Sequence, residues 1–152
     1  MIINGKELAK QIRSDLKKEV DALREDGIIP KLAVIMVGND KASEVYVRNK
    51  SKACNEVGIE FEEFLKDENT TQEELIELID ELNKREDIDG ILLQSPIPKQ
   101  LDIRQAFNRI DEKKDVDGFT PENVGRLAIG LEPYFYPATP QGIIMLLDEY
   151  NI

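Results

Sequence analysis

The chain has no histidine, no tryptophan and a single cysteine, Cys54, among its 152 residues. One cysteine cannot form an internal disulfide, and without histidine a zinc site or a Ser-His-Asp triad is excluded. Any catalysis must therefore depend on Lys, Tyr, Asp, Glu or Gln side chains, or on backbone groups.

Long hydrophobic runs are also absent, since none approaches the roughly 20 apolar residues that cross a bilayer. The first residues lack a basic segment followed by an apolar one, so they do not resemble a signal peptide. We therefore expect a protein that does not associate with membranes and is cytoplasmic.

Glycine spacing and charge exclude two further classes of ligand. No two of the 9 glycines are separated by one residue, so there is neither a dinucleotide fingerprint nor a glycine-rich phosphate loop. The net charge of -11, without any cluster of Lys and Arg, argues against nucleic acid. At 41% apolar residues the chain is long enough to fold as one domain with its own core.

The hydrophobic pattern alternates between helices and strands. It predicts strands at 32–37, 59–65 and 90–93, the second of them near an edge of the sheet. Capping signals predict helices that begin at Asn4, ahead of Tyr46, at Thr71, at Asp102, at Thr120-Pro121 and at Thr139-Pro140. This order predicts an α/β fold of three layers, in which helices flank a mostly parallel sheet.

Ligands of parallel sheets bind beyond the carboxyl ends of the strands. This rule selects the segment after Val37 and the loop that begins at Gln94, which we expect to lie on the same rim. Gln94 ends an apolar strand, so its amide should have a polar partner, and a lysine amine is one candidate.

The helix after Val37 carries Tyr46 and Lys50 on its predicted inward stripe. Lys50 could be a proton-transfer group with a lowered pKa, although the pattern alone favours a side chain that extends to water. Tyr46 could bind a flat ligand, but the pattern alone favours a core aromatic. For Ser43, a helix cap is favoured over a ligand contact.

Asp115 and Asp117 flank a valine before Gly118, and alternation would leave only one of them facing a ligand. The pattern favours an ordinary turn ahead of the next helix. A metal site is also conceivable for Asp-x-Asp, but no third carboxylate stands at calcium-loop spacing, and we predict no metal site.

Four segments together resemble one family. They are Tyr46-Val-Arg-Asn-Lys50, Gly90-Ile-Leu-Leu-Gln94 with Pro96-Ile-Pro98, Lys114-Asp-Val-Asp-Gly-Phe119, and Pro137-Ala-Thr-Pro-Gln-Gly142. In order and spacing they resemble the N-terminal catalytic domain, related to that of the amino acid dehydrogenases, of the bifunctional methylenetetrahydrofolate dehydrogenase/methenyltetrahydrofolate cyclohydrolase family. Two positions depart from the usual pattern, with Ser95 in place of a leucine and Ala138 in place of a cysteine.

The resemblance implies roles for the residues of these segments. Lys50 is implied to be catalytic and Gln94 to orient it, while Tyr46 stacks on the folate and Asp117 holds the pterin edge. Ser43 matches a serine of the family that lies one turn before the tyrosine, and Pro96 and Pro98 are implied to shape the pocket wall.

The resemblance also implies that residues 1–152 form the folate-binding catalytic domain. In the family a second, NADP-binding Rossmann domain follows, so we expect the NADP site to lie outside these residues and the intact protein to be a homodimer. Two hypotheses follow for the isolated chain. It either retains cyclohydrolase activity without the dehydrogenase step, or it binds a tetrahydrofolate derivative without turnover.

Overall fold

The structure, a computed structural model, describes residues 2–152. Its strands are β1 (Lys31–Val37), β2 (Glu60–Lys66) and β3 (Gly90–Leu93). Its helices are α1 (Gly5–Glu25), α2 (Lys41–Val57), α3 (Gln72–Lys84), α4 (Ile103–Arg109), α5 (Pro121–Ala128) and α6 (Ala138–Glu149). Within these residues no helix combines the length and the hydrophobicity needed to cross a bilayer.

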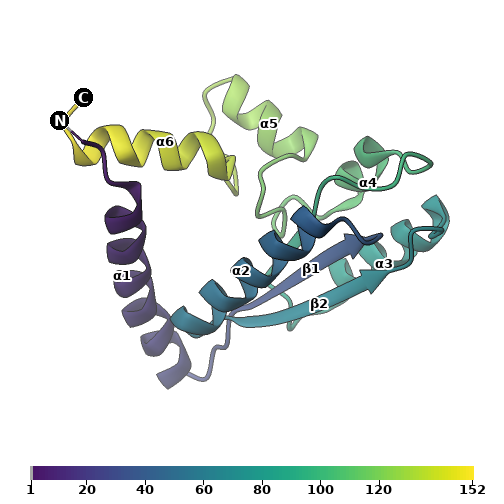
Figure 1. The fold of residues 1–152 in the computed structure, drawn as a ribbon, viewed down its shortest axis with the longest axis horizontal. Coiled ribbons are helices and arrows are strands. Elements are labelled where there is room, and N and C mark those ends of the chain that lie inside the picture. Colours follow the sequence, from purple (N-terminus) through teal and green to yellow (C-terminus); the bar gives the residue numbers. More distant parts are fainter. Residues whose placement is uncertain (1) are drawn as a thin grey trace.

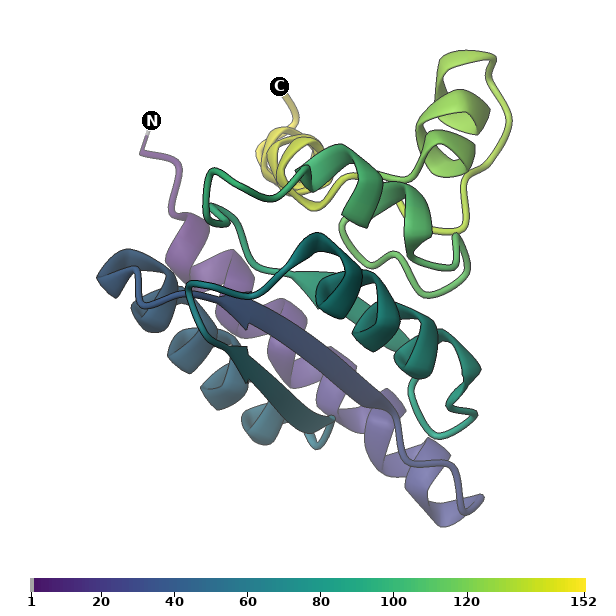
Figure 2. The ribbon, with the colours of Figure 1, turned by 90° about the vertical axis from the view of Figure 1, so that its right-hand side faces the viewer.

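The three strands form a parallel sheet in the order β2-β1-β3. Successive residues of a strand face opposite sides of the sheet, so the apolar β1 is buried on both. Ile35 and Val37 belong to the core beneath α3 and α4, whereas Val34 and Met36 pack with Val47 of α2. Figure 2 shows the helices on both faces. The predicted three-layer α/β fold and the edge position of β2 are therefore confirmed.

Four of the predicted helix starts are confirmed by their capping bonds. The side chains of Asn4, Thr71, Asp102 and Thr120 each accept a hydrogen bond from a backbone N–H in the first turn of the helix that follows. At Thr71 the bond is reciprocated, because the Glu74 side chain accepts from the Thr71 N–H at 2.8 Å. These bonds satisfy N–H groups that have no partner inside the helix.

The last helix begins earlier than predicted. The expected start at 139–140 is wrong, since α6 begins at Ala138 and is preceded by Pro137, which makes no side-chain capping bond. The far end of α6 contacts the start of the chain, where the Asn4 N–H donates to the Tyr150 hydroxyl at 2.8 Å.

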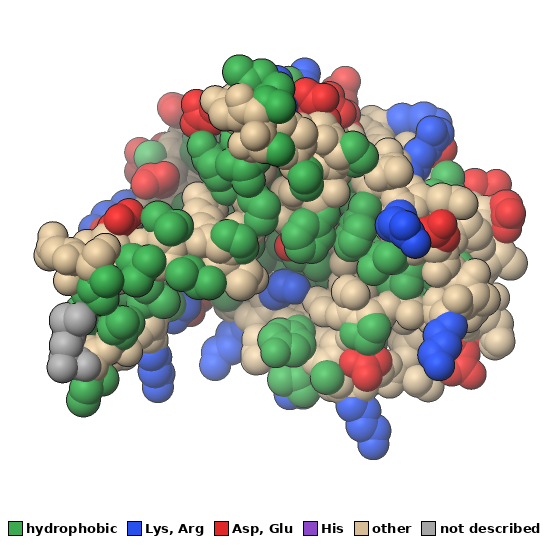
Figure 3. Space-filling view, turned by 90° about the horizontal axis from the view of Figure 1, so that it is seen from above, with side chains coloured by type: hydrophobic (Ala, Val, Ile, Leu, Met, Phe, Trp, Pro, Cys, Tyr) green, Lys and Arg blue, Asp and Glu red, His purple; other side chains and the backbone are tan. Residues whose placement is uncertain are grey.

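Helices α5 and α6 lie to one side of the three layers (Figure 1). Between them is a hollow of about 450 Å³, lined almost entirely by apolar atoms. Pro140 and Gln141 also line the hollow, and we call its other lining residues, Leu127, Tyr136, Pro137, Ile144 and Met145, the α5–α6 apolar face. Figure 3 shows hydrophobic side chains gathered on this side of the molecule.

Candidate functional site

Lys50 and Gln94 come from different elements and meet at the carboxyl end of the sheet. Lys50 lies in α2, and Gln94 directly follows β3. The Lys50 Nζ donates to the Gln94 Oε1 at 2.8 Å, and the Gln94 Nε2 donates to the Ser95 carbonyl at 2.7 Å. The second bond fixes which end of the amide faces the lysine. The predicted lysine partner of Gln94 is confirmed, and the alternative of a Lys50 side chain extending to water is wrong.

The surroundings of Lys50 favour loss of its proton. Burial lowers the pKa of the Lys50 ammonium, and the Asp117 carboxylate acts in the opposite direction. Burial raises the pKa of Asp117, while Lys50 lowers it and Asp115 raises it further. Each environment disfavours the charged form of its own group. The site thus contains an amine whose proton is easier to remove than that of an exposed lysine, near a carboxyl group that holds its proton more tightly.

Tyr46 lies beside this pair but outside the core. Its side chain is 63% exposed, whereas the adjacent Val47 is 2% exposed and packs against β1. The expectation of a core aromatic is therefore wrong. Successive helix residues are separated by about 100° around the axis, so Val47 occupies the inward line and Tyr46 lies at its edge. An exposed ring one turn from Lys50 leaves a flat face for a ligand to cover.

Ser43 is not the cap of α2. Asp40 caps this helix, because its Oδ1 accepts from the Ser43 N–H at 2.7 Å. Ser43 is itself 2% exposed, and its hydroxyl faces the Ser95 carbonyl at 3.5 Å. The prediction that Ser43 caps the helix is wrong. Its side chain belongs to the group around Gln94, through the Ser95 carbonyl that both contact.

The segment 114–119 holds Asp117 in place through its neighbours. The Lys114 Nζ donates to the Asn83 and Arg85 carbonyls at the end of α3, at 3.0 and 2.7 Å. Asp115, 2% exposed, accepts from the Thr120 N–H at 2.7 Å. Asp115 is thus part of the framework that leads into α5, whereas Asp117 acts on Lys50.

Gly118 completes this framework from the other side. Its φ of +66° lies in the left-handed region, and a Cβ at this position would lie 2.8 Å from the Phe135 carbonyl oxygen and 2.9 Å from the Pro137 nitrogen. Glycine is therefore required both by conformation and by space. This close approach brings the segments 114–119 and 137–142, which the sequence analysis singled out separately, into contact.

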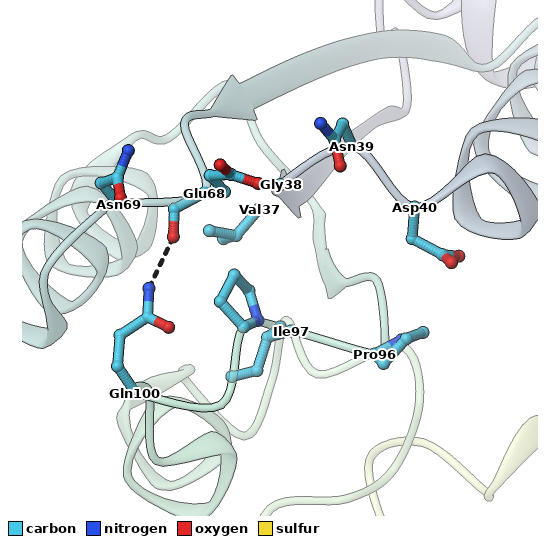
Figure 4. Close-up of a pocket in the computed structure, with 10 residues that line it drawn as sticks. Val37, Gly38, Asn39, Asp40, Glu68, Asn69, Pro96, Ile97 and Gln100 are labelled. Atoms are coloured by element: carbon cyan, nitrogen blue, oxygen red, sulfur yellow. Dashed lines mark hydrogen bonds between the residues drawn. The ribbon is translucent and has the colours of Figure 1, made fainter.

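Pro96 and Pro98 line a neighbouring cavity of about 610 Å³. Its wall also includes Gly38 and Asp40 after β1 and Glu68 after β2 (Figure 4). The two prolines therefore line a cavity at the carboxyl end of the sheet, and their place in the wall of a folate pocket stays a prediction. However, Lys50, Tyr46, Gln94 and Asp117 are not among the residues that line it. Within residues 2–152, no three His, Cys, Asp or Glu residues are placed to hold a metal ion together.

Asn123 is the residue that the sequence analysis missed. It is 1% exposed in α5, and its side chain contacts both Asp115 and the backbone of Tyr134. The sequence signal for it is weak, since an asparagine three residues after a helix cap is usually exposed. Only the fold shows that two loops converge on it.

A family model described as tetrahydrofolate dehydrogenase/cyclohydrolase, catalytic domain, matches residues 3–117. The bifunctional protein FolD of Acetivibrio thermocellus is 54% identical over 151 residues, which are 99% of this chain and 53% of that protein. The chain therefore spans about half the length of the curated relatives it matches.

Solved structures agree with the sequence relatives. The crystal structure of the bifunctional FolD methylenetetrahydrofolate dehydrogenase/cyclohydrolase from Campylobacter jejuni has a TM-score of 0.98 at 43% identity, covering 100% of this chain and 54% of that one. The FolD of Trypanosoma brucei, complexed with NADP and an inhibitor, has a TM-score of 0.95 at 34% identity, covering 100% and 52%. The recognition from four sequence segments is confirmed: this chain belongs to the tetrahydrofolate dehydrogenase/cyclohydrolase family.

Proposed function

We propose that residues 1–152 form the folate-binding catalytic domain of an enzyme of one-carbon metabolism. The enzyme oxidises methylenetetrahydrofolate to methenyltetrahydrofolate with NADP and hydrolyses the product to formyltetrahydrofolate. The observation that carries this proposal is the 2.8 Å bond from the Lys50 amine to the Gln94 amide oxygen, with Asp117 acting on the same amine.

The hydrolytic step needs a group that moves protons near neutral pH. Water adds to the methenyl carbon, one of its protons is released, and the other moves to the nitrogen whose bond to that carbon breaks. An amine with a lowered pKa accepts the first proton and, as an ammonium, donates one to the leaving nitrogen. Lys50 is the group we assign to this transfer, and Gln94 holds its Nζ in one direction.

Substrate binding is assigned to the groups around Lys50. Tyr46 offers an exposed ring for stacking on the folate, and Asp117 offers a carboxyl for hydrogen bonds to the pterin edge. The buried Ser43 hydroxyl is assigned to the same site, while Pro96 and Pro98, which line the neighbouring cavity, are assigned to the pocket wall on the family resemblance alone. These roles rest on the placement of the side chains and on the family resemblance.

The dehydrogenase step needs NADP, which supplies the hydride acceptor when bound. Residues 1–152 contain no glycine pair of the dinucleotide-binding type, so we expect the NADP site in another domain of the intact protein. The α5–α6 apolar face supports this proposal, because an exposed hollow lined by apolar side chains is typical of a surface that packs against another domain. For the intact protein a homodimer remains a prediction.

The test is hydrolysis of methenyltetrahydrofolate by the 152-residue chain without nucleotide, followed by loss of its absorbance. We expect a rate above buffer that disappears in Lys50→Met, which removes the amine and keeps the length of the side chain. Lys52→Met, on the exposed side of the same helix, is the matched control and should retain the rate.

The second hypothesis, a folate-binding half without turnover, makes a different prediction. In that case reduced folate protects the chain against thermal unfolding, while neither the wild type nor Lys50→Met hydrolyses the substrate. A chain that shows neither turnover nor protection by folate would contradict both hypotheses.

A further inference from the structure

Asn123 joins two loops of the molecule at one buried point. Its Nδ2 donates to the Glu112 carbonyl at 2.9 Å and to the Asp115 carboxylate at 3.0 Å. Its Oδ1 accepts from the backbone N–H of Tyr134 at 2.9 Å and of Phe135 at 3.4 Å. Both ends of the amide are therefore satisfied, and each end contacts a different loop.

The first of these loops carries Asp117, two residues after Asp115. The second loop provides the backbone against which Gly118 packs, with the Phe135 carbonyl oxygen 2.8 Å from where a Cβ on Gly118 would lie. On one side of Asp117 lies Asp115, which is bonded to Asn123. On the other side lies Gly118, which packs against the 134–137 loop, and Asn123 also bonds that loop. A shift of either loop would move the Asp117 carboxyl.

We propose that Asn123 is a positioning residue that holds the Asp117 carboxyl near the Lys50 amine. Its contacts are with the framework, and it acts on the site only through the loop that it fixes. The inference rests on the proposed function for its effect on folate, but the position of Asp117 relative to Lys50 can be measured without any ligand.

The measurement uses the charges that act on Lys50. In the folded chain, burial lowers the pKa of Lys50 and Asp117 raises it, while Lys50 and Asp115 are the charged groups that act on Asp117. If Asp117 moves away, the pKa of Lys50 falls further. Asp117→Asn gives the full effect of losing this charge and serves as the reference.

The variant that tests the proposal is Asn123→Ala, with the pKa of Lys50 followed by NMR of its side-chain carbon next to the amine. We expect Asn123→Ala to lower this pKa in the same direction as Asp117→Asn. Asn108→Ala, at an exposed position of α4, should leave it unchanged. A folded Asn123→Ala chain with the wild-type pKa at Lys50 would overturn the proposal.

A second variant keeps the test valid if Asn123→Ala does not fold. If Asn123→Ala does not fold, Asn123→Ser, which keeps a polar group at the position, takes its place in the same titration. Failure of both to fold would assign Asn123 to stability alone and would also overturn the proposal.

Binding of tetrahydrofolate provides the second readout. We expect about tenfold weaker binding to Asn123→Ala, equivalent to the loss of one hydrogen bond to a charged group. If the wild-type chain does not bind tetrahydrofolate, the proposed function fails while the titration of Lys50 still decides the position of Asp117.

Discussion

Replacement of Gly118 by alanine tests whether the segment next to Asp117 is held as tightly as the structure indicates. The added Cβ would lie 2.8 Å from the Phe135 carbonyl oxygen, 2.9 Å from the Pro137 nitrogen and 3.0 Å from the Tyr136 carbonyl carbon. All three are backbone atoms, so no flexible side chain can move aside. The backbone of the 134–137 loop must shift.

The magnitude has two parts. A non-glycine residue in the left-handed region costs about 1–2 kcal/mol. Inserting a methyl group into a closely packed position costs typically about 1–3 kcal/mol. Together they predict that Gly118→Ala lowers the free energy of unfolding by about 2–5 kcal/mol, which is a large share of the roughly 5–15 kcal/mol of an ordinary domain.

Urea unfolding followed by circular dichroism measures this difference, and Gly142→Ala is the matched control. Gly142 lies within α6 with no atom within 4 Å of its added Cβ, so the same substitution should stabilise the chain by up to about 1 kcal/mol. Changes of opposite sign in the free energy of unfolding of the two variants would support the close packing seen at Gly118. A Gly118→Ala chain within 0.5 kcal/mol of the wild type, a margin typical of neutral surface substitutions, would refute it.

Two further predictions concern charge. Gln94→Glu places a carboxylate next to the Lys50 amine and raises the pKa of Lys50. The rate of methenyltetrahydrofolate hydrolysis should therefore begin to rise at a higher pH than in the wild type. An unchanged pH–rate profile would contradict the assignment of Lys50 as the proton acceptor. Arg85 contacts the carboxylates of Glu62 and Asp87 at 2.7 Å each and lowers the pKa of both. Lowered carboxyl pKa values stabilise the fold above the unfolded-state values, and this contribution is lost as the pH falls through the folded-state values. Arg85→Met should therefore melt slightly below the wild type at pH 7, and the difference in melting temperature should narrow progressively as the pH falls below about 4. A difference in melting temperature that does not change as the pH falls would show that these ion pairs contribute nothing to stability.

The sheet could be predicted from the sequence because its central strand is buried on both faces. The continuous apolar run at 32–37 has no helical alternative of sufficient length, and the run at 90–93 is bounded by Gly90 and by the prolines after Gln94. The helix starts at Thr71 and Thr120 were predictable for a similar reason, since a side-chain cap is a local feature. Pro137 has no such side chain, and the start of α6 was therefore misplaced.

The pairing of Lys50 with Gln94 was also predictable, because a buried amide at the end of an apolar strand requires a partner. The error at Tyr46 arose because helical periodicity leaves an uncertainty of one residue: Tyr46 and Val47 are adjacent, and both lie within one turn of Lys50. Only contact with β1 determines that Val47 enters the core. Asn123 had only a weak local signal, since its partners come from loops whose approach depends on the complete fold.

The pKa of Lys50 is lowered and that of Asp117 is raised, and both shifts make the stability of the folded chain depend on pH. The folded chain binds the Lys50 proton less tightly than the unfolded chain does, so the site gains stability as the pH rises toward the ordinary lysine value. It binds the Asp117 proton more tightly, so it loses stability as the pH rises through the range just above the ordinary aspartate value. Burial opposes the charged form of both groups. The bonds of Lys114 and Asp115 and the close packing at Gly118 hold the segment of Asp117, and the Gln94 amide holds Lys50. The fold thereby keeps the two groups together against that penalty.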